Sequence, residues 1–114
     1  ETLAAKLLCE NGYCLIDRNY RCRSGEIDII VERDQLLVFV EVKTRSHPSL
    51  QAALDNVSYR KQVNLTKAAN DFLNQNQQYR DYNTRFDIVV VIYNAKEDTF
   101  TAHHYQDAFL PIQL

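Results

Sequence analysis

The sequence predicts an α/β domain in which helices flank a mixed β-sheet, and three observations lead to this prediction. Strand-like and helix-like runs follow one another in the order α-β-β-β-α-β-β. One long helical run lies between two apolar strands, which is the arrangement of a crossover that joins parallel strands. The 114 residues are 46% hydrophobic and 25% charged, as in one soluble folded domain, and no internal boundary interrupts residues 1–114.

The first half of the chain predicts one helix and three strands. The helix covers residues 1–10 and ends at Asn11-Gly12, a typical C-terminal stop, and the first strand covers residues 13–20. Three leucines at helical spacing indicate this helix: Leu3, Leu7 and Leu8. Two further strands, at residues 25–33 and 36–43, are separated only by polar residues, so we expect them to form an antiparallel hairpin.

The second half predicts a long helix between two strands and one further strand at the end. After a polar loop at residues 44–49 come a short helical piece at 50–57 and a helix over 58–77. Apolar residues at i, i+3, i+4, i+7 and i+8 indicate the longer helix: Leu65, Ala68, Ala69, Phe72 and Leu73. The strand at 86–93 is apolar on both faces, so we expect it to be central and covered, and a last strand follows near 99–105.

Composition excludes several classes of protein. The longest apolar run, residues 88–93, is far shorter than the ~20 residues of a membrane-spanning helix. The three cysteines, at positions 9, 14 and 22, match no zinc-binding spacing, and their odd number argues against a disulfide framework. We therefore expect free thiols, a cytoplasmic location and no contact with a membrane. Because the chain contains no Met and begins inside a helical pattern, we expect its natural N-terminus to lie upstream.

Positive charge is concentrated in two stretches, although the whole chain is slightly acidic. The formal net charge of −2 argues against a protein that coats nucleic acid without selectivity. The first basic stretch holds Arg18, Arg21 and Arg23. Between residues 43 and 67, five bases accompany a single acid, Asp55: Lys43, Arg45, Arg60, Lys61 and Lys67. These stretches predict a local basic rim that binds phosphate, and an ordinary solvated surface is an equally good account.

Charged side chains interrupt the predicted hairpin on one face only. If the turn is centred after position 34, paired positions sum to 69, so Asp28 falls opposite Glu41. By the same count, Glu26 falls opposite Lys43. The other face is wholly apolar, with the pairs Ile27–Val42, Ile29–Val40 and Val31–Val38. A slip by one residue would place charges on the apolar face, so the pattern itself selects this register.

The opposed pair of Asp28 and Glu41 predicts a cation site. Directly opposed side chains have Cβ atoms ~5 Å apart, and two carboxylates at that distance repel unless a proton or a cation lies between them. Mg²⁺ and Mn²⁺ prefer such oxygen ligands, and Lys43, two residues after Glu41, projects to the same side. The pattern is that of a metal site for phosphodiester hydrolysis. A solvated face of salt bridges is the other interpretation of the same charges.

Asp28, followed across the hairpin by Glu41-Val42-Lys43, resembles the PD-(D/E)XK signature of nucleases with the restriction-endonuclease-like fold. More narrowly, the chain resembles the YraN family of small bacterial proteins, which are similar to archaeal Holliday-junction resolvases. The blocks that carry this resemblance cover most of the chain: Asn11-Gly12-Tyr13, Asn19-Tyr20-Arg21, Gly25-Glu26-Ile27-Asp28, Val38-Phe39-Val40-Glu41-Val42-Lys43-Thr44-Arg45, Arg60-Lys61-Gln62 and Arg85-Phe86-Asp87. The proline of the signature is absent, and Gly25-Glu26 stands in its place.

The resemblance implies a restriction-endonuclease-like α-β-β-β-α-β core and a metal-dependent endonuclease that acts on DNA, branched or junction DNA included. Asp28 and Glu41 would be ligands of Mg²⁺ or Mn²⁺, with the carbonyl of Val42 as a third ligand. Lys43 would be the catalytic lysine. Gln62, on the helix after the motif, would support the site.

The same resemblance assigns further residues and partners. In the resolvases a glutamate on the first helix joins the site, and counting back from Asn11-Gly12 places Glu1 there, with Glu10 as the alternative. Four bases would contact phosphate: Arg21, Arg23, Arg45 and Lys61. Cleavage at two places in a junction would use a two-fold homodimer. Two other functions stay open, a non-catalytic nucleic-acid-binding module and a protein-interaction domain that retains the fold.

Three polar residues of the last two strands lie outside the motif. Asp87, at the start of the central strand, is expected to pair with Arg85 or with another neighbouring base. His103 and His104 are neighbours on a strand that we expect at the sheet edge. We therefore expect both histidines at the surface rather than at a metal ion.

Overall fold

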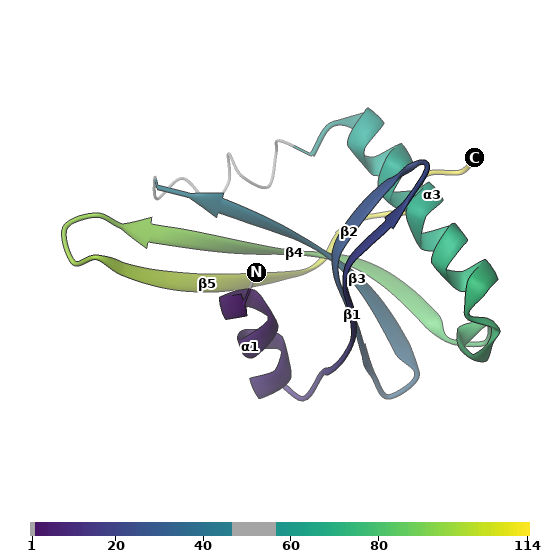
Figure 1. The fold of residues 1–114 in the computed structure, drawn as a ribbon, viewed down its shortest axis with the longest axis horizontal. Coiled ribbons are helices and arrows are strands. Elements are labelled where there is room, and N and C mark those ends of the chain that lie inside the picture. The colour runs from purple at the N-terminus through teal and green to yellow at the C-terminus, as the bar shows by residue number, and fades with distance from the viewer. Residues whose placement is uncertain (1, 47–56) are drawn as a thin grey trace.

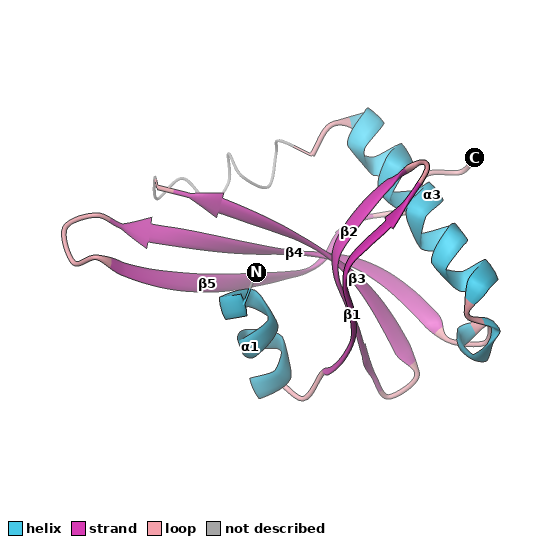
Figure 2. Cartoon of the chain, in the orientation of Figure 1, coloured by secondary structure: helices cyan, strands magenta, loops and turns pink. Residues whose placement is uncertain are grey.

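Within the described residues, 2–46 and 57–114, five strands form one mixed sheet in the computed structural model. The strands are β1 (Cys14–Cys22), β2 (Gly25–Arg33), β3 (Leu36–Arg45), β4 (Asn83–Asn94) and β5 (Thr99–Phe109). The helices are α1 (Thr2–Glu10), α3 (Tyr59–Gln75) and a 3-10 turn at Gln77–Tyr79. The strand order is β1-β2-β3-β4-β5, and of these neighbours only β3 and β4 run parallel. Because α3 lies between β3 and β4 in the chain, it forms the predicted crossover (Figure 2), which confirms the α/β fold class.

The observed elements follow the predicted order, and their ends differ by a few residues. β3 continues through Thr44 and Arg45, which the sequence placed in a loop, because its parallel pairing with β4 extends to Arg45 and Ile92. The short helix predicted at 50–57 lies outside the described residues except for Val57, which is not helical. No helix in the described part of the chain is long and apolar enough to cross a membrane.

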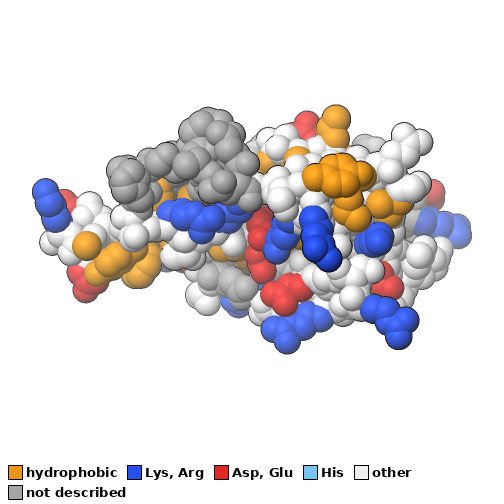
Figure 3. Space-filling view, turned by 90° about the horizontal axis from the view of Figure 1, so that it is seen from above, with side chains coloured by type: hydrophobic (Ala, Val, Ile, Leu, Met, Phe, Trp, Pro, Cys, Tyr) orange, Lys and Arg blue, Asp and Glu red, His pale blue; other side chains and the backbone are white. Residues whose placement is uncertain are grey.

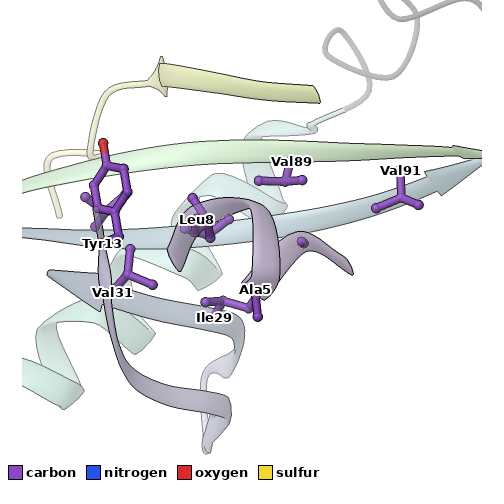
Figure 4. Packing of buried hydrophobic residues seen from close by; sticks show 10 residues of the cluster. Ala5, Leu8, Tyr13, Ile29, Val31, Val89 and Val91 are labelled. Carbon is purple, nitrogen blue, oxygen red and sulfur yellow. The ribbon is translucent and has the colours of Figure 1, made fainter. Parts of the chain in front are cut away.

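A helix covers each face of the sheet. α1 packs on one face through Ala4, Ala5 and Leu8, as Figure 4 shows for part of the cluster. Its partners alternate along the hairpin and along β4: Ile29, Val31, Val38, Val40, Val89 and Val91. α3 packs on the opposite face, where its buried side chains meet the intervening residues Ile30, Leu37, Phe39 and Phe86. Each fully buried side chain of this kind stabilises the fold by roughly 1.5–3 kcal/mol relative to exposure.

Local contacts position the first turn of α3. Ser58 is its N-cap residue, and the Ser58 hydroxyl accepts a hydrogen bond from the backbone N–H of Lys61 at 3.1 Å. The side-chain amide of Gln62 donates to the carbonyl of Val57 at 3.0 Å. These two contacts fix the start of the helix and therefore the place from which the Lys61 side chain extends.

The hairpin of β2 and β3 has the predicted register over its closed end. Ile29 pairs with Val40 and Val31 with Val38, so paired positions sum to 69 as expected. The turn residues Asp34 and Gln35 have φ angles of 52° and 63°. Positive φ at both central residues is the geometry of a type I′ turn, which matches the twist of the flanking strands. The hairpin thus adopts its favoured turn without the glycine that usually marks it.

Beyond Ile29 and Val40 the two strands separate. Ile27 packs in the cluster under α3, whereas Val42 packs against the cluster under α1, so these residues lie on opposite faces. The predicted pairs Ile27–Val42 and Glu26–Lys43 therefore do not form, which corrects the sequence-based register at the open end of the hairpin. In Figure 1 the hairpin of β1 and β2 turns toward α3, while β3 continues beside β4.

Packing against α3 explains why β2 leaves β3. The last ladder pair of β1 and β2 joins Cys22 to Gly25, so β2 remains bound to β1 along its whole first half. Gly25 lies close to α3, because a Cβ atom at that position would be 3.3 Å from both the Cβ and the carbonyl oxygen of Asn64. The absence of a side chain at Gly25 lets the hairpin of β1 and β2 lie against α3. An opening between β2 and β3 results, and it begins at Asp28.

Candidate active site

The opening between β2 and β3 holds the carboxylate of Asp28 and the peptide group of Val42. Asp28 Oδ2 accepts a hydrogen bond from the backbone N–H of Val42 at 2.8 Å. In a β-strand the N–H and the C=O of one residue point toward the same neighbouring strand. The carbonyl of Val42 therefore points into the same opening as its N–H. The structure thus places a carboxylate oxygen and a backbone carbonyl oxygen at one edge of β3.

The carboxylate of Glu41 lies next to this edge, on the face that α3 covers. Glu41 lies two residues after Phe39, which belongs to the cluster under α3, so both side chains point to the same face of the sheet. The Glu41 side chain is only 11% exposed. Burial raises the pKa of the Glu41 carboxyl, and the nearby negative charge of Asp28 raises it further, while Lys61 and Lys43 oppose this shift. The two acids are thus near enough for their charges to interact, although they are not a ladder pair.

Two lysines from different elements lie near Glu41, and Arg45 adds a positive charge near Lys43. Lys61, on the first turn of α3, places its Nζ atom 3.4 Å from Glu41 Oε1. Lys43 is 9% exposed and follows Glu41 by two residues on β3. Burial and the positive charge of Arg45 lower the pKa of the Lys43 ammonium, and Glu41 opposes that change. The predicted site residues Glu41, Lys43, Arg45 and Lys61 therefore form one electrostatic cluster.

The remaining predicted phosphate contacts lie on the hairpin of β1 and β2. Arg21 Nε is 3.1 Å from Glu26 Oε2, and both side chains are largely exposed. Glu26 thus pairs with Arg21, and the predicted partnership of Glu26 with Lys43 is wrong, because β2 pairs with β1 at this point. Arg23 is exposed in the turn that joins β1 to β2. These arginines are carried by the hairpin that forms one wall of the opening.

Acidic and basic side chains lie close together on this side of the molecule. Figure 3 views the domain from above the orientation of Figure 1, the side on which α3 begins. Acidic side chains lie near the middle of that face, and lysine and arginine side chains flank them. The arrangement suits a ligand that carries negative charge and is accompanied by a cation.

The other predicted site residues occupy different positions. The amide of Gln62 is hydrogen-bonded to Val57 next to Lys61, as described above. Glu10 is exposed and lies 4.0 Å from Lys6 on the side of α1 away from the sheet, so α1 does not bring it to the carboxylates. Glu1 lies outside the described residues.

The donor set at the opening fits a hard divalent cation. Two carboxylates, Asp28 and Glu41, and the Val42 carbonyl are three oxygen-donor groups, and Mg²⁺ typically combines one or two carboxylates with waters and substrate phosphate. Among the described residues there is no group of three or more His, Cys, Asp or Glu side chains that could hold a metal ion. Zinc sites of the usual closed type are therefore not formed by this part of the chain. The ammonium of Lys61 already occupies a cation position at Glu41.

Comparison with known proteins identifies the family. The sequence pattern described as "Uncharacterised protein family UPF0102" matches residues 1–91, which include every candidate site residue. The chain belongs to UPF0102. This is the family, also called YraN, that the motif blocks resemble. The matched residues extend from the start of the chain to within β4, so the sheet up to that strand and both helices belong to the family pattern.

Individual UPF0102 relatives match most of the chain. A "UPF0102 protein" of Caldicellulosiruptor bescii is 37% identical over 109 residues, covering 96% of this chain and 92% of the relative. A "UPF0102 protein" of Clostridium beijerinckii is also 37% identical over 109 residues, covering 96% and 88%. One from Stutzerimonas stutzeri is 41% identical over 91 residues, covering 80% and 76%. The likeness therefore extends over most of this chain and most of each relative.

A second polar cluster lies on the α1 face, centred on Asp87. The guanidinium of Arg85 donates two hydrogen bonds to the Asp87 carboxylate, each at 2.7 Å, which confirms the predicted pair. His104 Nε2 is 2.6 Å from Asp87 Oδ2, and the His104 side chain is only 9% exposed. The surface position predicted for His104 is therefore wrong, whereas His103 is exposed as predicted. Neighbouring residues of a strand point to opposite faces, so His103 is exposed while His104 points toward the buried ring of Tyr13.

The Asp87 cluster is fully satisfied and structural. Asp87 is buried, and its Oδ1 atom, which already accepts from Arg85 Nε, also accepts a hydrogen bond from the backbone N–H of Asp107 at 2.9 Å, where the register of β4 and β5 is interrupted. Burial opposes ionisation of Asp87, but hydrogen bonds from His104 and Arg85 outweigh it and lower the pKa of the carboxyl. Arg85 also donates to the hydroxyl of Tyr13 at 2.8 Å. The sequence signals for this cluster were Arg85 and Asp87, two charged residues next to an otherwise apolar run.

Proposed function

We propose that this UPF0102 protein is a metal-dependent endonuclease that hydrolyses DNA phosphodiester bonds. One observation carries the proposal: the partly buried carboxylates of Asp28 and Glu41 lie at the edge where β2 and β3 separate, with Lys43 beside them. Acids that repel each other in a partly buried site are stabilised by a cation or a proton between them. A cation held by oxygen ligands next to a lysine is the composition of a phosphodiester-hydrolysing site.

Each residue of the opening has a chemical task in this proposal. Asp28, Glu41 and the Val42 carbonyl would hold Mg²⁺ or Mn²⁺, which supplies charge stabilisation and an activated water when bound. The ammonium of Lys43 would orient that water or stabilise the negative charge that develops on the phosphate. Phosphates on either side of the cleaved bond would meet Arg45, Lys61, Arg21 and Arg23. Gln62 would support the first turn of α3, from which Lys61 extends.

Branched DNA is the substrate class that we propose. The bases are divided between β3, α3 and the hairpin of β1 and β2, so they surround the opening instead of following one straight groove. Such an arrangement suits strands that leave in different directions. Cleavage of two strands at one junction needs two sites, so we propose a homodimer as the active form.

A cleavage assay with metal controls tests this function. Purified protein is incubated with four-way junctions, flaps and linear duplexes in Mn²⁺, in Mg²⁺ and in EDTA. We expect cleavage that depends on the divalent cation and favours the branched substrates, because the ligands are hard oxygen atoms. If none of these substrates is cut with either cation, the enzymatic proposal is wrong.

A non-catalytic nucleic-acid-binding module is the second candidate, and the existing ion pairs favour it. Glu41 already pairs with Lys61, and Glu26 with Arg21, as on a surface whose charges neutralise one another. This candidate predicts salt-dependent DNA binding that needs Arg21, Arg23 or Lys61. Binding would then be the same with and without divalent cations, and substitution of Asp28 would leave it unchanged.

A further inference from the structure

The ion pair between Lys61 and Glu41 joins a flexible, half-exposed lysine side chain to a carboxylate held in the sheet. Glu41 belongs to β3, which is paired with β4 at this position, and its side chain is 11% exposed. Lys61 is 49% exposed and reaches the carboxylate from the first turn of α3 through a flexible four-carbon chain. If the pair separates, the lysine can turn to solvent, whereas the carboxylate stays in place.

The geometry of this pair is that of a loose contact. Its Nζ–Oε1 distance is 3.4 Å, whereas charge-assisted hydrogen bonds of this type are usually about 2.7–2.9 Å. The pair offsets one negative charge, while Asp28 adds a second one nearby. A divalent cation between the two acids would satisfy both. The ammonium group and such a cation therefore compete for the same carboxylate.

The first turn of α3 carries positive charge where helices usually carry negative charge. It contains no acidic residue, and Arg60 and Lys61 are both exposed there. Basic side chains at a helix N-terminus are unfavourable for the helix itself, because the helix dipole is positive at that end. The same combination attracts a phosphate group. A lysine released from Glu41 would therefore have an anionic partner to bind.

We propose that Lys61 exchanges partners when the site binds a divalent cation. Without the cation it neutralises Glu41, and with the cation it is displaced and becomes a contact for a DNA phosphate. Lys61 is then a positioning residue that couples the two binding events, so each ligand strengthens the binding of the other. This inference rests on the proposed function, because it needs the same carboxylates to hold the cation.

Metal binding in the absence of DNA tests the first half of the exchange. Mn²⁺ affinity is measured by calorimetry or electron paramagnetic resonance for the wild type, for Lys61→Gln and for Lys67→Gln. Lys67 is exposed on the same helix and serves as the matched control. Because a competing positive charge is removed, we expect Lys61→Gln to bind Mn²⁺ about 3- to 10-fold more tightly. The control should bind as the wild type does.

The salt dependence of DNA binding tests the second half. Affinity for a four-way junction is measured at several salt concentrations, once in Ca²⁺ and once in EDTA. We expect Ca²⁺ to steepen the slope of log K against log salt by about 0.9 for the wild type, the value for one additional phosphate contact. For Lys61→Gln the slope should not change on addition of Ca²⁺.

The outcomes separate this inference from the nuclease proposal. Equal Mn²⁺ affinity in the wild type and Lys61→Gln, or no Mn²⁺ binding by either, would overturn the exchange. If that happens while the wild type cleaves DNA in Mn²⁺, the exchange alone is wrong. If Lys61→Gln binds Mn²⁺ more tightly and no substrate is cleaved, the exchange stands and the nuclease proposal is wrong.

Discussion

Replacement of Asp28 by asparagine or of Glu41 by glutamine is expected to lower DNA cleavage by about three orders of magnitude or more. Each variant removes one of the two charges that would hold the cation, while the size of the side chain stays the same. We expect Asp28→Asn to keep the fold, because an asparagine side chain retains an oxygen atom that can accept the hydrogen bond from the N–H of Val42. Cleavage rates in Mn²⁺ with a single junction substrate measure the effect.

Glu26→Gln is the matched control for these variants. Glu26 lies two residues before Asp28 on β2 and carries the same charge, but it pairs with Arg21 on an exposed face. We expect Glu26→Gln to cleave within about twofold of the wild type, because exposed ion pairs contribute little. Loss of cleavage in Glu26→Gln, or full cleavage in the Asp28 and Glu41 variants, would contradict the assignment of the site.

Asp87→Ala is expected to lower the free energy of unfolding by about 3–5 kcal/mol, since it leaves the buried partners of a salt bridge uncompensated. Arg85 loses two hydrogen bonds, His104 loses its partner, and the N–H of Asp107 loses its acceptor. Urea denaturation at neutral pH measures the change. A loss below about 1 kcal/mol would show that the cluster contributes little to stability.

The pH dependence of the same variant follows from the lowered pKa of Asp87. A carboxyl whose pKa is lower in the folded state stabilises the fold above its unfolded pKa of about 3.9, and this contribution is lost as the pH falls through the folded pKa. The difference in stability between wild type and Asp87→Ala should therefore be full at neutral pH and shrink below about pH 4. Asp81→Ala, which replaces an exposed acid, is the control. It should change the free energy of unfolding by less than about 0.5 kcal/mol both at neutral pH and below about pH 4.

Local patterns in the sequence were enough to predict much of the fold. The order of helices and strands follows from apolar periodicity, and the closed end of the hairpin follows from alternation, because a slip at Ile29–Val40 would expose the apolar face. The parallel pairing of β3 with β4 follows from the helix between them. Asp28 and Glu41 were recognisable for the same reason, since charges stand out within strands that are otherwise apolar.

The partners of these charges depend on packing between elements that are far apart in the chain. β2 leaves β3 at Asp28 because its first half stays with β1 and packs on α3, so Glu26 pairs with Arg21 instead of Lys43. Lys61 reaches Glu41 only because α3 begins beside the open end of the hairpin. Alternation along a strand is a property of that strand alone, so the sequence was sufficient to identify the residues of the candidate site. The opening and the pairing of Lys61 with Glu41 depend on packing against α3, which no local pattern encodes.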